Sequence, residues 1–364
     1  MKFTIQRDAL SDALSKVQSI VGSRPSIPIL SNVKLLAEKG LLTLTTTELE
    51  ISISATVEAQ VSREGLITLP ARRVASIIRE LPAGEVEVEL DDKNCAHIRS
   101  GPAYFKMIGM SAEDFPPLPS FEAARSYVID QGVFKEMIRK VAYAASVDET
   151  RYILNGSLLS FADEKLTVVA TDGRRLALAE AEVEFAAETA AELVVPTKTI
   201  NELLRFLADE GPLKIRAADN QASFEFGRVL VFSKLLEGKF PNYRQVIPSR
   251  AEHRIAIERE LLLSAVRRAA LVTSEQSSSI RLAFSKNRIE VITSTPDIGE
   301  SREKIPVKYQ GDDFSIAFNP GFIIEPLKVL TQDEVFLEMT DELSPGVIKC
   351  DQPFLYVIMP LRTA

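Results

Sequence analysis

One segment occurs three times in this 364-residue chain at nearly constant spacing. It reads FTIQRDALSDALSKV at residues 3–17, YVIDQGVFKEMIRKV at 127–141 and RIAIERELLLSAVRRA at 254–269. The isoleucines near the start of each copy are at positions 5, 129 and 257, so they stand 124 and 128 residues apart. This period is too long for a solenoid unit and matches the commonest domain size, so an internal repeat of whole domains is predicted.

A second segment repeats with the same period. It reads LPARRVASIIREL from residue 69, VPTKTINELLRFL from 195 and NPGFIIEPLKVL from 319. Its prolines, Pro70, Pro196 and Pro320, stand 126 and 124 residues apart. Proline-rich connectors, FPPLP at 115–119 and FPNY at 240–243, follow the first two copies. We therefore predict three domains, at residues 1–119, 120–249 and 250–364.

Each domain is expected to hold two helices backed by antiparallel sheet, an α+β architecture. The first segment alternates apolar and polar residues and then changes to helical spacing, as in Leu10, Ala13, Leu14 and Val17. The second segment has helical spacing in its first two copies. Clean alternation elsewhere, as in EVEVEL at 85–90, is typical of antiparallel strands with one buried face.

The third copy of the second segment departs from the pattern. It keeps Ile324 and Leu327 but has Lys328 at the next apolar position and Pro326 inside the expected helix. Because proline lacks a backbone donor, we expect a kink or a late helix start there.

The composition restricts the classes of function. Cys95 and Cys350 make neither a disulfide framework nor a metal cluster, and His97 and His253 belong to different repeats and form no motif. The two cysteines are typical of buried thiols in a reducing cytoplasm, where we expect the protein to act. No run is apolar and long enough to span a bilayer, so no membrane association is expected. We expect no cofactor and no catalytic or metal-binding residue.

The net charge of −8 argues against a nucleic-acid partner, but its distribution argues for one. The strands carry the acids, as in Glu85, Glu87 and Glu89. The predicted helices carry more bases than acids on their polar faces: Arg7, Lys16, Arg72, Arg73, Arg79, Lys135, Arg139, Lys140, Lys198, Arg205, Arg259, Arg267, Arg268 and Lys328. Ordinary solvated helices also carry Lys and Arg, but recurrence over six helices favours a basic surface near phosphates. No aromatic ladder for stacking on bases is present.

Six short motifs, taken in order along the whole chain, resemble those of the bacterial beta sliding clamp family, the processivity subunit of DNA polymerase III. They are MKFTI at 1–5, SIPIL at 26–30, RYILNG at 151–156, TDGRRL at 171–176, FPNY at 240–243 and YVIMPLR at 356–362. The resemblance implies the DNA clamp fold, in which two chains of three domains form a six-domain ring around duplex DNA. The helices would line the hole, and topology would retain the ring on DNA, because diffuse phosphate contacts give only weak non-specific binding.

The resemblance also implies a shallow apolar pocket between the second and third domains that takes a short glutamine- and leucine-bearing peptide. The expected partners are the polymerase III alpha subunit, the delta subunit of the clamp loader, repair polymerases, ligase and mismatch-repair proteins. Polymerase and 3'-5' exonuclease activities would belong to other subunits of the holoenzyme. The pocket walls carried over are Leu154, Thr171, Gly173, Arg174, Arg175, Leu176, Pro241, Val246, Phe322, Leu343, Val357, Met359, Pro360, Leu361 and Arg362.

Several parts of this interpretation have plainer alternatives. Residues 171–173 also fit an Asp-Gly hairpin turn, and residues 356–358 a last core strand. Gln245 replaces a base that relatives often carry, and Pro345 lies near one wall, so the peptide preference stays open.

The resemblance implies DNA-facing and subunit-facing residues as well. DNA would meet two loops that hold Arg24, Arg151 and Tyr152, together with the helical bases Arg72, Arg73, Arg79, Lys135, Arg139, Lys198 and Arg205. The homodimer interface would join Phe105 and Met107 of one chain to Leu271 and Val272 of the other. Surface-loop and core roles, respectively, are the alternatives.

Two other classes of function compete with a DNA clamp. An enzyme is disfavoured because the sequence has no spaced metal or general-acid set, no Gly-rich phosphate loop and no nucleophile elbow. A repeat-built scaffold that binds proteins but not DNA is disfavoured by the basic helix faces.

Overall fold

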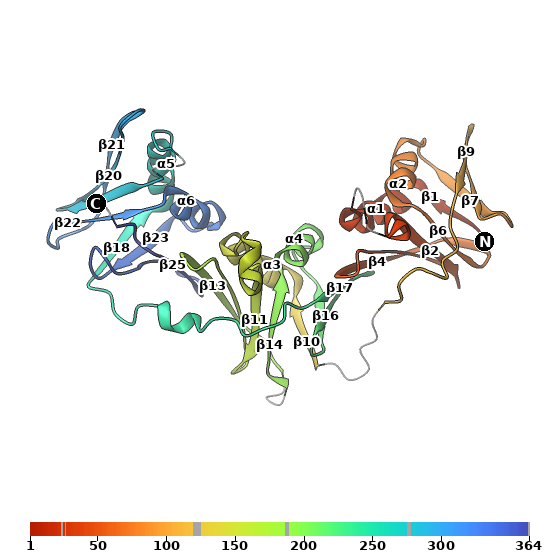
Figure 1. The fold of residues 1–364 in the computed structure, drawn as a ribbon, viewed down its shortest axis with the longest axis horizontal. Coiled ribbons are helices and arrows are strands. Elements are labelled where there is room, and N and C mark those ends of the chain that lie inside the picture. Colours follow the sequence, from red (N-terminus) through yellow and green to blue (C-terminus); the bar gives the residue numbers. More distant parts are fainter. Residues whose placement is uncertain (23–24, 26, 119–124, 186–188, 275–277, 363–364) are drawn as a thin grey trace. The chain divides into compact units, whose positions relative to one another are not determined.

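The computed structural model describes residues 1–22, 25, 27–118, 125–185, 189–274 and 278–362. The chain divides into two compact units, which are treated separately. The first comprises Met1–Gly132 and Glu202–Leu235, and the second comprises Val133–Asn201 and Leu236–Ala364. Figure 1 labels their helices and strands.

The same order of elements recurs three times: a strand, a helix, a set of strands, a second helix and three final strands. The first copy has β1(Lys2–Gln6), α1(Arg7–Val17), β2(Asn32–Glu38), β3(Leu41–Thr47), β4(Ile51–Glu58), β5(Gln60–Arg63), β6(Gly65–Pro70), α2(Ala71–Glu80), β7(Glu85–Leu90), β8(Cys95–Ser100) and β9(Ala103–Ile108). The second copy has β10(Arg125–Asp130), α3(Gln131–Val141), β11(Gly156–Ala162), β12(Lys165–Thr171), β13(Arg175–Glu182), β14(Ala191–Pro196), α4(Thr197–Phe206), β15(Pro212–Ala217), β16(Gln221–Phe226) and β17(Val229–Lys234). The third copy has β18(His253–Glu258), α5(Arg259–Ala270), β19(Ile280–Ser285), β20(Arg288–Thr295), β21(Gly299–Pro306), β22(Phe314–Phe318), α6(Pro320–Val329), β23(Glu334–Met339), β24(Gly346–Lys349) and β25(Phe354–Ile358). The predicted repeat and the antiparallel α+β unit are confirmed.

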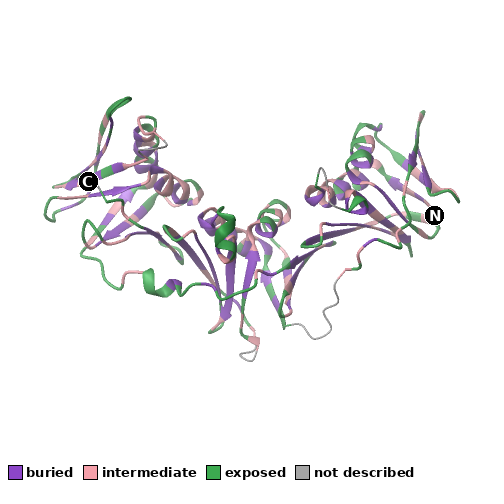
Figure 2. Ribbon diagram, viewed as in Figure 1, coloured by how far each residue is buried: buried purple, intermediate pink, exposed green. Residues whose placement is uncertain are grey.

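The helices bury the apolar positions that the periodicity predicts. Leu10, Ala13, Leu14 and Val17 of α1 are all buried. Figure 2 shows buried residues along the helices and along the strands beneath them, and on α6 only Lys328 is exposed. In the first unit α1 packs beside α2, and both cover β2, β3, β4 and β6. A helix with one apolar stripe gains most of its stability from this packing rather than from its own propensity.

Of the two outcomes expected near Pro326, a kink or a late helix start, the late start is wrong. Helix α6 begins at Pro320, directly after its cap residue Asn319, whose side chain accepts a hydrogen bond from the Gly321 amide (2.9 Å). It continues through Pro326 to Val329. Proline is well suited to the first helical position, and burial of Pro326 and Leu327 offsets the missing hydrogen bond. The buried isoleucine is Ile323, and Ile324 is only half-buried.

Two eight-stranded antiparallel sheets cross from one repeat into the next. In the first unit the strand order is β10-β15-β16-β17-β4-β3-β2-β6, so β17 of the second repeat pairs with β4 of the first. In the second unit the order is β14-β11-β12-β13-β25-β24-β23-β18, so β25 of the third repeat pairs with β13 of the second. The third strand after the first helix of one repeat therefore pairs with the last strand of the following repeat at both junctions.

The remaining strands form two smaller sheets with open edges. The first is β5-β1-β7-β8-β9 and the second is β21-β20-β19-β22. Within the described residues, strand β9 has β8 as its only paired strand, and β21 has only β20. Strand β9 is the last strand of the first repeat, and β21 is the third strand after the first helix of the third repeat. These are the same two kinds of strand that pair at both internal junctions.

Candidate functional site

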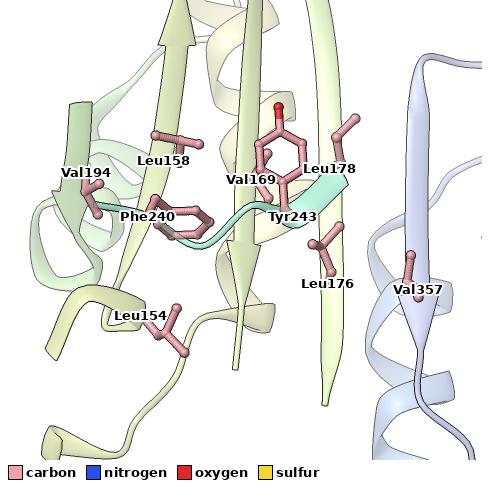
Figure 3. Close-up of a cluster of buried hydrophobic side chains, with 9 residues drawn as sticks. All are labelled: Leu154, Leu158, Val169, Leu176, Leu178, Val194, Phe240, Tyr243 and Val357. Carbon is pink, nitrogen blue, oxygen red and sulfur yellow. The ribbon is translucent and has the colours of Figure 1, made fainter. Parts of the chain in front are cut away.

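An apolar cluster in the second unit forms the floor of the candidate site (Figure 3). Strands β11, β12, β13 and β14, the connector after β17 and strand β25 all contribute to it. Its buried members are Leu154, Leu158, Val169, Leu176, Leu178, Val194, Phe240, Tyr243 and Val357. The antiparallel register places Leu176 directly opposite Val357, so the sheet that joins the two repeats also brings their side chains together.

Exposed apolar side chains lie on the chain segments that continue from this cluster: Val246 follows Tyr243, and Met359 and Leu361 follow Val357. Each is about two-fifths exposed, and Leu343, another predicted wall residue, is 75% exposed. Pro241 and Arg362 are exposed, whereas Pro360 is half-buried. Exposed apolar residues that gather around an apolar floor mark a binding site more often than scattered ones do.

The C-terminal segment is held by hydrogen bonds on alternate residues. The Met359 amide donates to the Arg174 carbonyl (2.9 Å), and the Leu361 amide donates to the Ala317 carbonyl (2.8 Å). Two of the predicted walls, the β12–β13 turn and residues 359–362, are therefore joined directly.

The β12–β13 connection is the Asp-Gly turn that one interpretation predicted. The Asp172 carboxylate accepts hydrogen bonds from the amides of Arg174 (2.9 Å) and Arg175 (3.1 Å). Gly173 has φ +84°, which favours glycine, and a Cβ there would lie 2.9 Å from Nη1 of Arg151. Thr171 is buried, and its hydroxyl donates to the Arg175 carbonyl (2.6 Å).

Arg175 differs from the other basic residues assigned to the pocket because its side chain is only 9% exposed. Its Nε lies 3.1 Å from a carboxylate oxygen of Asp172, and its Nη2 donates to the Tyr143 carbonyl (2.7 Å). Its Nη1 donates to the Glu325 carboxylate, and its guanidinium lies over the Phe322 ring, 4.5 Å from the centroid. Arg174, by contrast, is exposed.

Burial dominates the titration of the groups around this arginine. It raises the pKa of the Tyr143 hydroxyl well above its ordinary value, and it raises that of Tyr356 as well. It also lowers the pKa of the Lys140 ammonium, whose Nζ donates to the Gln352 side chain. Lys140 is therefore a buried residue that connects α3 to the β24–β25 turn, and its expected place on a solvent-facing basic surface is wrong.

The segment before β11 carries two residues predicted to meet DNA. Tyr152 is 56% exposed, and Arg151 donates from Nη1 to the Asp172 carbonyl (2.8 Å). Asp148 caps this segment, and hydrogen bonds from the Thr150 hydroxyl and amide lower the pKa of its carboxyl. A cavity of about 390 Å³ lies here, with Asp148, Arg151 and Glu325 among its lining residues.

The predicted DNA-facing bases fall into two groups. Arg73 and Arg79 are exposed, and Arg205 is exposed with its guanidinium over the Phe206 ring. Arg72 is exposed as well, but its guanidinium donates to the Val21 carbonyl (2.6 Å). Arg139 is half-buried and paired with Glu136 (2.6 Å). Lys198 is exposed and Lys135 is half-buried, whereas Arg24 lies outside the described residues.

The residues assigned to the subunit interface also separate into two groups. Phe105 on β9 and Leu271 after α5 are exposed, the latter by 80%, and Val272 is half-buried. Met107 is only 6% exposed, although Phe105, two residues before it on the same face of β9, is exposed. Ile108, which the sequence analysis missed, is 78% exposed on the same strand, and strand alternation after Met107 would have identified it.

Sequence reasoning also missed several members of the site. Phe240 and Tyr243 belong to a motif that had been recognised, but only its proline was assigned to a wall. Leu158 and Val169 follow from the alternation of β11 and β12. Nothing local in the sequence pointed to Tyr143 or Glu325, because their role depends on contacts with Arg175.

Comparison with known proteins identifies the family. Three sequence profiles match consecutive parts of the chain: the DNA polymerase III beta subunit N-terminal domain at residues 1–119, its central domain at 128–242 and its C-terminal domain at 244–362. The chain belongs to the beta sliding clamp family. The beta sliding clamp of Chlamydia trachomatis is 34% identical over 362 residues, covering all of this chain and 87% of that protein.

Solved structures of the family have the same fold. The DNA polymerase sliding clamp of Bacillus subtilis matches with a TM-score of 0.96 and 31% identity over the full length of both chains. A sliding clamp of Pseudomonas aeruginosa bound to griselimycin matches with a TM-score of 0.96 and 30% identity, also over both full lengths.

Family membership settles the general function. The chain is a DNA sliding clamp, which encircles duplex DNA without sequence specificity and tethers the replicative polymerase to it. It is a non-catalytic processivity subunit, and the enzymatic activities belong to other subunits. Among the described residues, no helix has the length and apolar character needed to cross a membrane.

Proposed function

We propose that this clamp closes as a homodimer through strands β9 and β21. The observation that carries the proposal is the pairing rule at both internal junctions, where the third strand after the first helix of a repeat pairs with the last strand of the next repeat. Applied once more, the rule pairs β21 of one chain with β9 of another, and two head-to-tail contacts close a ring of six domains. Exposed Phe105, Ile108, Leu271 and Ile298 lie on or beside these strands and support an apolar seam.

The domain organisation follows the three repeats. We propose domains at residues 1–119, 120–249 and 250–364, a division supported by the three profile matches. In the ring, the helix faces that carry Arg73, Arg79, Lys198 and Arg205 would line the hole, with Lys135 and Arg139 beside them. Arg24, Arg151 and Tyr152 would meet DNA at its exit. As a replication factor, the protein is expected in the cytoplasm.

We further propose that the apolar cluster and its rim form the docking site for partner peptides. An apolar floor bordered by Val246, Met359 and Leu361, with few polar groups to fix register, suits the glutamine- and leucine-bearing peptides that the family resemblance implies. The specific partners proposed are the polymerase III alpha subunit, the delta subunit of the loader, repair polymerases, ligase and mismatch-repair proteins. Gln245 and Pro345 distinguish this chain's rim.

Deletion of residues 359–362 tests the docking site. It removes one wall while leaving the β25 pairing in place, so polymerase stimulation on primed circular DNA should be lost while the protein remains dimeric in sedimentation. A charge-reversed Glu342→Lys variant, altered on an exposed residue of the third repeat, serves as a control that should retain stimulation. Full stimulation by the deletion variant would contradict the assignment of the pocket.

A further inference from the structure

We propose that Glu325 and Phe322 of α6 hold Arg175 as an internal latch, so that Arg175 positions the peptide pocket instead of contacting the peptide through its charge. The proposal rests on the proposed docking site and deepens it. Arg174, Met359 and the apolar rim remain the residues that meet the peptide. Glu325 becomes a positioning residue, and nothing in the sequence had assigned it a role.

Three segments supply the partners of this guanidinium. Asp172 belongs to the β12–β13 turn, Tyr143 to the segment after α3, and Glu325 to α6 of the following repeat. Each of the three guanidinium nitrogens donates to one of them. A charge that is more than nine-tenths buried requires such partners, and removing one leaves a desolvated donor unpaired. Three of the five guanidinium N–H groups are thereby used within the protein.

Helix α6 presents its two contacts on one face. Phe322 and Glu325 are three residues apart and therefore neighbours on the helix surface, where one stacks on the guanidinium and the other accepts its hydrogen bond. Cap residue Asn319 and the first-turn Pro320 fix where the helix begins. The position of the carboxylate is thus determined by the start of α6.

The latch affects the pocket through the residues on either side of Arg175 in the chain, Arg174 and Leu176. Arg175 pairs with Ile358 across the β13–β25 junction, and Leu176, the next residue, contributes to the apolar floor. The carbonyl of the preceding residue, Arg174, accepts a hydrogen bond from the Met359 amide. If the guanidinium loses its hydrogen bond to Glu325, the β12–β13 turn becomes more mobile. The positions of Leu176 and of the C-terminal segment at Met359 are then less well defined.

The test measures peptide affinity by fluorescence anisotropy for two versions of a glutamine- and leucine-bearing peptide, one with acidic flanks and one with neutral flanks. Glu325→Ala should weaken both by a similar factor of about fivefold or more, as expected when a buried guanidinium loses a charged hydrogen-bond acceptor. Arg175→Lys should do the same, because an ammonium cannot replace the planar fork. The double variant Arg175→Ala with Glu325→Ala should be no weaker than Arg175→Ala alone.

Glu334→Ala is the matched control, because Glu334 is an exposed acid of the same repeat on β23, outside the pocket and the latch. It should leave both affinities unchanged. The latch would be refuted by a Glu325→Ala variant with wild-type affinity, or by Arg175 variants that weaken only the acidic peptide. The latter outcome would assign Arg175 to a direct contact.

Hydrogen exchange without peptide separates the latch from the docking site itself. The amides of Arg174 and Arg175, which donate to Asp172, should exchange faster in Glu325→Ala than in the wild type and the control. Unchanged exchange would refute the latch even if affinity fell. Failure of the wild-type protein to bind either peptide would refute the docking site, while exchange would still decide the latch.

Discussion

Gly173 adopts φ +84° in the β12–β13 turn, where a Cβ would lie 2.9 Å from Nη1 of Arg151. Residues with a side chain reach this region at a cost of about 1–2 kcal/mol. The Asp-Gly pair was readable from the sequence as a turn, because glycine is the residue that such a turn needs. The contact with Arg151 was not readable, because it depends on how the segment before β11 packs on the turn.

We predict that Gly173→Ala weakens peptide binding with little loss of overall stability. The alanine must either strain the turn or displace Arg151, and both changes move the Arg174 carbonyl that holds Met359. Anisotropy should show a clear rise in Kd, while the melting temperature falls by only a few degrees, as roughly 1 kcal/mol would produce in a chain of this size. The matched control is Gly227→Ala, which also has positive φ but no close neighbour. Equal affinity in both variants would contradict the role of the turn.

The basic residues on the helices differ in whether their side chains are bound within the protein. The sequence predicted a basic surface from residue type alone, and it could not separate free arginines from committed ones. Arg72 donates to the Val21 carbonyl and Lys140 is buried, because the ends of neighbouring segments present acceptors to them. Exposed Arg73 and Arg79 remain available for phosphates.

We predict that reversing Arg73, Arg79 and Arg205 to Glu shortens retention on DNA and leaves peptide binding unchanged. Replacing three phosphate-facing cations by anions removes attraction that should be strongest at low salt. Arg72→Glu, in contrast, should mainly lower stability, since it leaves the Val21 carbonyl without its donor. Loading assays at two salt concentrations and thermal unfolding measure the two effects. Undiminished retention of the triple variant would count against a basic lining.

The helices could be predicted from the sequence, whereas the start of α6 and the pairing of strands between repeats could not. Periodicity in the two repeated segments predicted the places of α1–α6. The late start expected at Pro326 was wrong because a proline inside a helix can be tolerated where it is buried, and the burial of Pro326 depends on tertiary packing. The pairing of β13 with β25 was also out of reach, since strand alternation indicates a buried face but does not name a partner nearly 180 residues away.

Strand β9 presents the exposed Ile108 at an open sheet edge. Ile108→Lys should shift the protein from dimer toward monomer in sedimentation, because it places a charge in the proposed seam. Val128→Lys is the matched control, since Val128 is an exposed apolar residue on β10, another edge strand. The control should remain dimeric. A dimer that tolerates Ile108→Lys would remove β9 from the interface.

The distribution of charge over the whole molecule explains how an acidic chain can have DNA as its partner. A net charge of −8 would repel DNA if it were spread evenly, but the six α-helices hold 14 bases against 7 acids. The prediction that the strands carry the surplus of acids is wrong, because the strands hold 17 bases and 16 acids, and the surplus lies in the connecting segments. The threefold repeat and the motifs allowed the sequence to predict the fold and the clamp function. The seam between subunits and the latch around Arg175 needed three-dimensional contacts, because each joins segments that only the folded chain brings together.

Retention on circular DNA tests the central claim most directly. The protein is loaded on a nicked circle with a matching loader and ATP, half of the sample is linearised, and bound protein is followed by gel filtration. A ring that surrounds the duplex should remain on the circle and run off the linear DNA. Equal retention on both forms would mean that contact energy holds the protein, and it would contradict topological linkage.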